Sequence, residues 1–299
     1  MANQSKQLVV LSGKGGTGKT SISAALAYEI KEQMQQPLVL IDADVDAANL
    51  ALLLHPEIQN QSVFCDAEVA QIDAQACTAC GICLQTCRYD AIIEGQPYSV
   101  DGIACEGCGA CVFTCPEQAI SLHEESSGFW FKSESLVGPM LHAELDPGGE
   151  NSGKLVALLK QQGVQAAREI NAVLMLVDGP PGTGCPAIAA CSGTDLALLV
   201  TEPGLAAFHD LKRITATARH FNMPCVLCIN KADINLKIKE EIVTWAEQES
   251  IPVLAEINFD EKMIECVMQG QIITQAYPQS KAAQQIKTLW TGLGKSLSI

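Results

Sequence analysis

An N-terminal stretch decides the fold, and it reads Leu8-Val9-Val10-Leu11-Ser12-Gly13-Lys14-Gly15-Gly16-Thr17-Gly18-Lys19-Thr20. An apolar run, a loop with four glycines and a helical apolar pattern from Ile22 to Met34 follow one another. That order is the context of a phosphate-binding P-loop, because the loop N–H groups and the helix N-terminus face phosphate oxygens. We therefore predict an α/β fold with a doubly wound, mostly parallel sheet. Lys19 is expected to reach the β- and γ-phosphates, and the Thr20 hydroxyl to bind Mg²⁺.

A repeated cysteine pattern is the second feature of the chain. Eight of the 14 cysteines form two copies, Cys77-x2-Cys80-x2-Cys83-x3-Cys87 and Cys105-x2-Cys108-x2-Cys111-x3-Cys115, and the second copy lies 28 residues after the first. This is the spacing of the bacterial ferredoxin run, in which the fourth cysteine of each copy ligates the other of two 4Fe–4S clusters. The first cluster is therefore assigned Cys77, Cys80, Cys83 and Cys115. The second is assigned Cys105, Cys108, Cys111 and Cys87.

Two other uses of close cysteines fit this pattern less well. Zinc favours two separated Cys-x2-Cys pairs for each metal ion. A disulfide framework belongs to exported chains, whereas this N-terminus shows no secretory signal. One departure from the ferredoxin pattern is Arg88 after Cys87, where the second copy has Pro116. Arg88 removes a turn cue but no ligand.

The second residue of the glycine-rich loop makes the motif more specific. With Lys14 after Gly13, the loop resembles the deviant Walker A motif of the MinD/ParA/Mrp family, which also includes the nitrogenase iron protein. The resemblance covers nearly the whole chain. It implies an ATPase that forms a nucleotide-dependent homodimer, in which Lys14 crosses the interface to the nucleotide of the partner.

Two aspartate segments resemble the switches of the same family. Asp42-Ala43-Asp44 follows an apolar strand, and the resemblance implies that Asp42 helps to hold Mg²⁺ while Asp44 orients the attacking water. Asp178-Gly179-Pro180-Pro181-Gly182 follows another strand, with Asp178 as the carboxylate on the metal side and Gly182 sensing the γ-phosphate. Each aspartate alone could simply cap the next helix. The implied catalytic residues are Lys14, Lys19, Asp44 and Asp178.

The segment Asn230-Lys231-Ala232-Asp233 bears on the base of the nucleotide. Asn230 stands where the family has a base-recognising asparagine, but the segment also matches the N-K-x-D guanine motif of GTPases. ATP is favoured because similar chains with both switches and a ferredoxin insert are regarded as ATPases, and GTP stays open. The residues expected to hold the nucleotide are Gly13, Lys14, Gly15, Gly16, Thr17, Gly18, Lys19, Thr20, Gly182 and Asn230.

The two motifs imply a discontinuous organisation. Residues 1–64 and 128–299 are expected to form the P-loop ATPase domain, and residues 65–127 a small α+β ferredoxin domain inserted into it. Such an insertion is tolerated when the inserted unit has neighbouring ends in a surface loop. Residues 128–145 are expected to form a β-hairpin, followed by a turn at 147–149.

Three further features each allow a functional and a purely structural interpretation. Cys225 and Cys228 have the spacing of a metal pair, but on a strand they face opposite sides, so we expect core residues. Cys185 has the offset of a cluster-bridging cysteine in the nitrogenase iron protein, but no second cysteine lies near residue 150, so we expect a buried structural thiol. The apolar stripe from Ile286 to Leu297 could anchor a membrane, as in MinD relatives, but its basic face is thin, so we expect a packed helix.

The composition narrows the partners. Among 299 residues, 34 are acidic and 19 basic, for a net charge of −15, which disfavours nucleic acid. No segment has the length of a transmembrane helix, and 14 cysteines without an export signal suit a reducing compartment, so we expect a cytoplasmic protein.

Two functions stay open from the sequence. The first is nucleotide-gated electron transfer through two 4Fe–4S clusters in a homodimer, toward a redox partner or metalloprotein. The second is an ATP-dependent carrier that assembles metal centres, or a switch that positions a complex. Two complete clusters favour the first, because a delivery scaffold needs labile, exposed ligands.

Overall fold

The computed structural model describes residues 5–146 and 151–299, so the turn expected at 147–149 lies outside the described residues. Contacts divide the chain into two compact units. Among the described residues, the larger unit comprises 5–62, 130–145 and 151–299, and the smaller comprises 63–129 and residue 146. The main boundaries therefore lie within two residues of those expected from the sequence, and residue 146 groups with the smaller unit.

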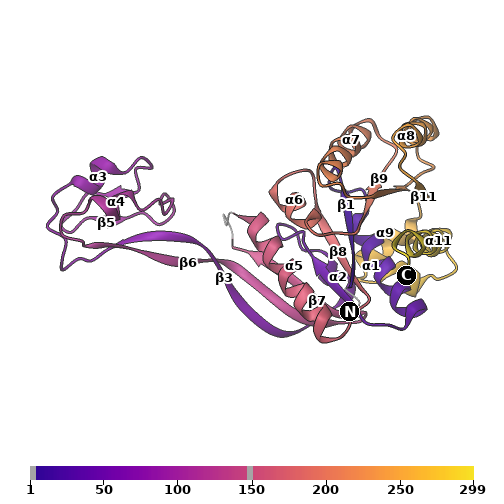
Figure 1. The fold of residues 1–299 in the computed structure, drawn as a ribbon, viewed down its shortest axis with the longest axis horizontal. Helices are drawn as coiled ribbons and strands as arrows, with labels where there is room; N and C mark the ends of the chain where they lie inside the picture. The colour runs from indigo at the N-terminus through magenta and orange to yellow at the C-terminus, as the bar shows by residue number, and fades with distance from the viewer. Residues whose placement is uncertain (1–4, 147–150) are drawn as a thin grey trace. The chain divides into compact units, whose positions relative to one another are not determined.

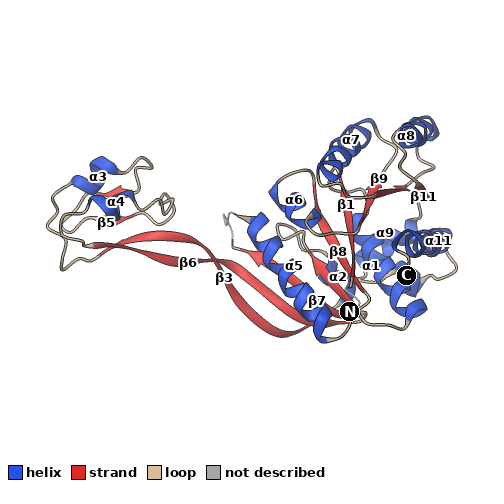
Figure 2. Cartoon of the chain, viewed as in Figure 1, coloured by secondary structure: helices blue, strands red, loops and turns tan. Residues whose placement is uncertain are grey.

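Strands and helices alternate along most of the chain (Figure 1; Figure 2). The strands are β1 (Lys6–Ser12), β2 (Leu38–Asp42), β3 (Glu57–Ile72), β4 (Ile92–Ile93), β5 (Ser99–Val100), β6 (Ile120–Ser135), β7 (Gly138–Leu145), β8 (Leu174–Pro181), β9 (Leu196–Thr201), β10 (Cys225–Asn230) and β11 (Val253–Ile257). The helices are α1 (Lys19–Met34), α2 (Leu50–Leu54), α3 (Ile82–Thr86), α4 (Ala110–Thr114), α5 (Ser152–Glu169), α6 (Cys185–Cys191), α7 (Leu205–His220), α8 (Leu236–Gln248), α9 (Glu261–Met268), α10 (Ile273–Ala276) and α11 (Lys281–Leu297).

Nine of the described strands form one large sheet in the order β11-β10-β9-β1-β8-β2-β7-β6-β3, and β4 and β5 pair as a separate antiparallel sheet. Strands β11, β10, β9, β1, β8, β2 and β7 pair in parallel along that order. The central strands are apolar along their whole length because helices cover both faces of a parallel sheet. This confirms the predicted α/β fold with a mostly parallel sheet. The sheet brings the carboxyl ends of β1, β2 and β8 together, where such folds bind ligands.

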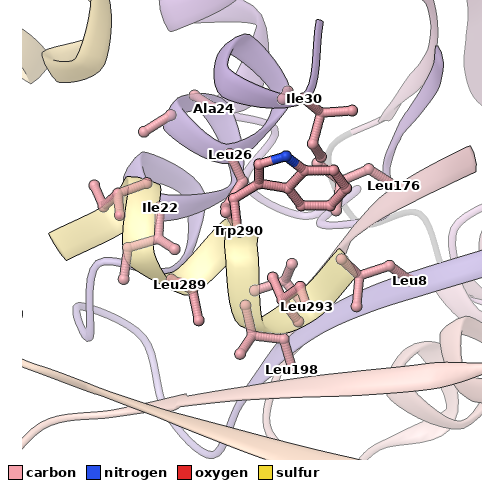
Figure 3. Close-up of a cluster of buried hydrophobic side chains, with 14 of the residues drawn as sticks. Leu8, Ile22, Ala24, Leu26, Ile30, Leu176, Leu198, Leu289, Trp290 and Leu293 are labelled. Carbon is pink, nitrogen blue, oxygen red and sulfur yellow. The ribbon is translucent and has the colours of Figure 1, made fainter. Parts of the chain in front are cut away.

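The C-terminal helix α11 packs into the core. Figure 3 shows its Leu289, Trp290 and Leu293 among Leu8 of β1 and Leu26 of α1. None of these five side chains is more than 5% exposed. Truncating one such core side chain typically costs about 2–5 kcal/mol of folding free energy. The apolar stripe is therefore used inside the fold, as the packed-helix interpretation expected. No helix in the described residues is long and apolar enough to cross a membrane.

The smaller unit repeats its structure as it repeats its sequence. Helices α3 and α4 begin 28 residues apart, each after a glycine in the left-handed region, Gly81 with φ 79° and Gly109 with φ 70°. The hydroxyls of Thr86 and Thr114 each donate to the carbonyl four residues earlier, at 2.8 and 3.0 Å. The two hydroxyls also lie 3.5 Å apart, so the equivalent helices meet.

The strand β6 is longer than the sequence suggested, and the long strand β3 was not predicted. The hairpin was expected from residue 128, but β6 begins at Ile120 and runs for 16 residues to Ser135. A two-residue connection joins β6 to β7, its neighbour in the sheet, so the hairpin itself is present. Polar residues such as His123 and Glu124 weakened the apolar alternation that marks a strand. Both β3 and β6 contribute residues to each of the two units.

Candidate functional site: a nucleotide pocket and two cysteine cavities

The glycine-rich loop lies between β1 and α1, and Asn230, the last residue of β10, contacts it. Gly18 precedes α1 with φ 88°, a backbone conformation that favours glycine. A Cβ atom there would stand 2.3 Å from Nδ2 of Asn230. That amide donates to the carbonyl of Thr17 at 2.8 Å. Asn230 therefore holds the loop in its curved shape.

Two aspartates from neighbouring strands form the acidic side of the site. The parallel register of β2 and β8 pairs Asp42 with Asp178, and both are buried. The hydroxyls of Thr20 and Ser23 each donate to a different oxygen of Asp178 at 2.7 Å. The Lys19 ammonium lies 2.9 Å from the same carboxylate. Lys19, Thr20, Asp42 and Asp178 therefore converge as the sequence predicted.

Burial changes the pKa of one of these aspartates, Asp42. It raises the pKa of Asp42 to about 8, and the facing charge of Asp178 adds to the effect. The backbone N–H groups of Asp44 and Leu50 donate to Asp42 at 3.2 and 3.1 Å, so the side chain also organises the first switch. The Asp44 carboxylate lies 3.8 Å from Lys19. Oxygen donors from Thr20, Asp42 and Asp178 are the type that Mg²⁺ prefers.

Lys14 is paired within its own chain. Its ammonium lies 2.7 Å from Glu202, which follows β9, and Lys231 lies 2.7 Å from the other oxygen of Glu202. Lys231 also donates to the carbonyl of Gly16 at 3.0 Å. Burial works to raise the pKa of Glu202, but the hydrogen bonds from the two lysines outweigh it and lower the pKa. Glu202 therefore links Lys14 to Lys231, which in turn contacts the loop at Gly16.

An open cavity of about 590 Å³ lies over the loop. Its wall includes the loop from Gly15 to Thr20, Asp44 of the first switch and Pro180 and Pro181 of the second. The N–H of Gly182 donates to the carbonyl of Ser12 at 2.9 Å, which ties the second switch to the end of β1. The loop from Gly15 to Thr20 and Asp44 therefore line one cavity. The other predicted residues are not part of its lining: Gly13, Lys14, Asp42, Asp178, Gly182 and Asn230.

The residues expected to recognise the base form hydrogen bonds within the protein. Asn230 is 2% exposed, and its Oδ1 has no partner among the described residues. Asp233 accepts a hydrogen bond from the N–H of Phe259 at 2.7 Å, which lowers its pKa, and another from the Asn258 amide at 3.2 Å. In the guanine motif this carboxylate must read the base. Its use as a loop clamp favours ATP over GTP.

The comparison with known proteins agrees with this geometry. The profile of the CobQ/CobB/MinD/ParA nucleotide binding domain matches residues 8–273. The chain belongs to this family. The uncharacterized protein MJ0578 of Methanocaldococcus jannaschii is 36% identical over 230 residues, which are 77% of this chain and 79% of that protein.

Solved structures of the MinD/ParA kind share the fold. The septum site-determining protein MinD of Pyrococcus horikoshii, complexed with Mg-ADP, has a TM-score of 0.58 at 17% identity and covers 97% of this chain and 96% of its own. A ParA family ATPase from Chlorobium tepidum has a TM-score of 0.57 at 16% identity, covering 96% and 98%. Members of the MinD/ParA family are ATPases, and the nucleotide-binding domain of this chain is that of an ATPase.

The smaller unit brings the eight repeated cysteines together as two sets of four, each around its own cavity. The first cavity is lined by Cys77, Cys80, Cys83 and Cys115. The second cavity is lined by Cys87, Cys105, Cys108 and Cys111. Each cavity thus takes three cysteines from one copy of the repeat and the fourth from the other, which are the two sets assigned from the sequence.

The cysteine cavities contain few polar contacts. The N–H of Ala70 donates to Sγ of Cys105 at 3.5 Å, and that of Ala119 to Sγ of Cys115 at 3.4 Å. Burial raises the pKa of the Cys83 and Cys111 thiols. Across residues 5–146 and 151–299, no group of three His, Cys, Asp or Glu side chains is close enough for a single metal ion.

The other cysteines follow the structural interpretations, with one correction. Cys228 is fully buried in the core, and burial raises its pKa to about 12. Cys225 is half-buried and donates to the carbonyl of Met223. Cys185 was expected to be buried, but it is exposed at the start of α6. The prediction was wrong because α6 begins at the surface directly after the second switch.

Sequence reasoning missed Glu202, Lys231 and Ser23 as parts of the nucleotide site. Ser23 lies one helical turn after Thr20, so the 3.6-residue period could have placed it on the same face. Glu202 follows a strand whose place beside β1 is known only from the sheet order. The sequence contains no signal for its contact with Lys14.

Proposed function

We propose that this protein couples ATP binding and hydrolysis in a homodimer to electron transfer through two 4Fe–4S clusters held by the smaller unit. One observation carries the proposal: eight cysteines converge as two exchanged sets of four within the same chain as a P-loop ATPase site. When bound, the clusters would supply one-electron redox centres.

The cysteine cavities suit a cluster better than a single ion. The ligands of a cubane bind different irons at its corners, so their sulfurs stand further apart than around one zinc ion. Each cavity is lined by four cysteines, three from one copy of the repeat and one from the other, which is the ligand pattern of a two-cluster ferredoxin. Buried Cys83 and Cys111 would exclude water from the inner side of each cluster, and the N–H groups of Ala70 and Ala119 would lie toward the ligating sulfurs.

The nucleotide site has the groups for hydrolysis. Lys19 can exchange its contact with Asp178 for phosphate oxygens, which are equally anionic partners. When bound, Mg²⁺ would neutralise phosphate charge beside Thr20, Asp42 and Asp178. Asp44 borders the cavity, where it can hold the attacking water. These roles match the general requirement for positioning and charge stabilisation in phosphoryl transfer.

The dimer would complete the site through Lys14. This lysine is only partly buried and is held by a single carboxylate, Glu202. In a face-to-face pair of chains, Lys14 could leave Glu202 and reach the γ-phosphate of the partner. A cation supplied in trans stabilises transition-state charge, as arginine fingers do in other P-loop enzymes.

A run of contacts inside the larger unit links the nucleotide site to the start of β3 and the end of β6. Asp42 accepts the N–H of Leu50, the first residue of α2. At the other end of α2, the carbonyl of Leu54 accepts the N–H of Leu136, directly after β6. The strand β3 begins at Glu57, three residues after α2. A nucleotide that moves Asp42 would therefore move both strands that continue into the smaller unit.

A second candidate is the cluster carrier or positioning switch. The observation that favours it is the exposure of Cys80 and Cys108, one in each set, since exposed ligands release a cluster more readily. Against it, Cys83 and Cys111 are buried. We favour electron transfer because each set contains a buried ligand.

Anaerobic reconstitution tests the proposal. Wild-type protein should bind about eight irons per chain and give the EPR signals of reduced 4Fe–4S clusters. Cys83→Ser should lose about half of the iron, whereas Cys266→Ser, which removes a buried thiol of the larger unit, should keep all of it. Zinc in place of iron, or a full iron content in Cys83→Ser, would contradict the proposal. Transfer of intact clusters to an apo-protein during ATP hydrolysis would support the carrier instead.

A further inference from the structure

The two halves of the smaller unit are structurally equivalent but differ in what they expose. The N–H of Gln75 donates to Asp73 at 2.8 Å, and 28 residues later the N–H of Ile103 donates to Asp101 at 3.0 Å. The repeat therefore provides an internal comparison. A difference in side chain at equivalent positions cannot come from a difference in backbone.

Two equivalent positions carry glutamine in the first half and a large apolar side chain in the second. Ile103 is 99% exposed, and its equivalent in the first half, Gln75, is also exposed. Phe113 is 91% exposed, and its equivalent in the first half is Gln85. In both helices the N–H at this position donates to the glycine four residues earlier, at 3.2 Å for Gln85 and 3.1 Å for Phe113. Ile103 and Phe113 are the most exposed large hydrophobic side chains in the described residues.

The rims of the two cysteine cavities differ in the same sense. Tyr89 lines the second cavity and is 49% exposed, whereas its repeat equivalent Glu117 lines the first cavity and is exposed. Ile103 lies two residues before Cys105, and Phe113 belongs to α4, the helix that lines the second cavity. Neither Ile103 nor Phe113 lines the cavity itself, and we call Tyr89, Ile103 and Phe113 together the apolar rim. At all three positions the other half of the repeat is polar.

Folding does not require these apolar residues. Glutamine occupies the equivalent positions in the first half with the same backbone hydrogen bonds. An exposed isoleucine or phenylalanine gains no burial energy in the isolated chain, since that energy follows the apolar area removed from water. The apolar rim therefore has its use in a contact with another molecule.

The charge of the smaller unit indicates which kind of molecule would bind the apolar rim. Residues 63–129 contain ten Asp or Glu and a single basic Lys or Arg residue, Arg88. Asp101 and Glu106, both exposed, flank Ile103 in the sequence. Two such surfaces repel each other, so a second copy of this chain does not fit. A basic surface with an apolar centre does fit, because opposite potentials favour association.

We infer that the apolar rim is the docking surface for a basic, one-electron redox protein, and that the cluster at Cys87, Cys105, Cys108 and Cys111 exchanges electrons with it. In one exchange, the reduced cluster loses one electron and the oxidised centre of the partner gains it, with no bond formed or broken. This inference rests on the proposed function and adds direction to it. Electrons would leave through the second cavity, not the first.

Cytochrome c, a basic haem protein and one-electron acceptor, serves as the probe. Its affinity for the oxidised, iron-loaded full-length protein is measured by calorimetry at several salt concentrations, and its reduction by the reduced protein by stopped flow. The test variant is I103Q/F113Q, which writes the first-half residues into the second half. The matched control is Q75A/Q85A, and I103L/F113L keeps apolar side chains at both positions.

I103Q/F113Q should raise the dissociation constant about tenfold, as truncation of central interface side chains commonly does. Q75A/Q85A and I103L/F113L should stay within about twofold of wild type, with iron content unchanged in all three. Affinity should fall with salt in every variant, because the acidic residues remain. Equal affinities for I103Q/F113Q and wild type, at full iron content, would overturn the docking inference alone. Wild-type protein that binds no iron would overturn the proposed function and this inference with it.

Discussion

The nucleotide site and the cysteine cavities balance their charges in opposite ways. In the nucleotide site, Lys19 is paired with Asp178 and Lys14 with Glu202, so each cation has a partner before any nucleotide arrives. In the cysteine cavities, buried thiols such as Cys83 have raised pKa values and no cation lines the wall. The first site can bind by exchanging partners. In the proposed function, iron would convert the thiols of the second site into thiolate ligands.

The comparison implies different consequences when a site is emptied or damaged. A protein with an empty nucleotide pocket should keep its sheet, because most of the core, including Trp290, lies outside the pocket, and Leu53 is shared between them. The smaller unit has a far smaller core, in which Cys83 and Cys111 are themselves buried members. Iron should therefore contribute to folding there, as structural metals do in other small domains. The following variants separate the two kinds of site.

The largest effects are expected at the two lysines of the loop. Lys19→Ala should weaken ATP binding about 100-fold or more, because the bound phosphates lose the cation that Lys19 supplies when it leaves Asp178. Lys14→Ala should leave binding nearly intact and slow hydrolysis about a thousandfold, as loss of a trans-acting cation does. Calorimetry and phosphate release measure the two quantities. Equal loss of binding in both variants would remove the case for a lysine acting across the dimer.

Pairs of cysteine substitutions test whether ligands are exchanged between the halves of the repeat. Cys80 and Cys115 line the first cavity, so C80S/C115S should still hold the second cluster, about four irons. Cys87 lines the second cavity, so C80S/C87S should lose both clusters. Anaerobic iron counting with EPR distinguishes them. The reverse outcome, in which C80S/C87S keeps half of its iron, would show that each copy of the repeat binds its own cluster.

A smaller effect is expected at Glu202. Glu202→Gln should weaken its hold on Lys14 and lower the protein concentration that gives half-maximal hydrolysis about threefold to fivefold, the range of a partly exposed ion pair. ATPase activity measured against protein concentration gives this value, and Glu247→Gln, an exposed glutamate of α8, is the control. A concentration dependence identical to wild type would mean that the pair with Lys14 does not restrain dimerisation.

The smallest effect on the nucleotide site is expected at Asp233. Asp233→Ala removes the acceptor of the Phe259 N–H and should cost about 1 kcal/mol of unfolding free energy, seen in denaturant titration. The ratio of ATP to GTP affinities should stay within about twofold of wild type. A selective loss of GTP affinity of tenfold or more would show that the carboxylate reads the base, as in GTPases.

The features that could be predicted from the sequence are those that depend on a local pattern of residues. The loop, Asp42 and Asp178 each follow an apolar strand, and parallel strands bring their carboxyl ends together, so their convergence could be expected. The 28-residue repeat likewise predicted which cysteines share a cavity. Glu202 could not be predicted, because its contact with Lys14 depends on β9 lying beside β1. Cys185 was misjudged because its exposure depends on where α6 emerges from the sheet.

The most direct test of nucleotide-gated electron transfer is an EPR redox titration of the clusters without nucleotide, with ADP and with a non-hydrolysable ATP analogue. Coupling of about 1–3 kcal/mol between two sites corresponds to a shift of about 40–130 mV for a one-electron centre. We expect the ATP analogue to shift the cluster potential by this amount in wild-type protein and to leave it unchanged in Lys19→Ala. The same potential in all three nucleotide states of the wild type would contradict the central claim.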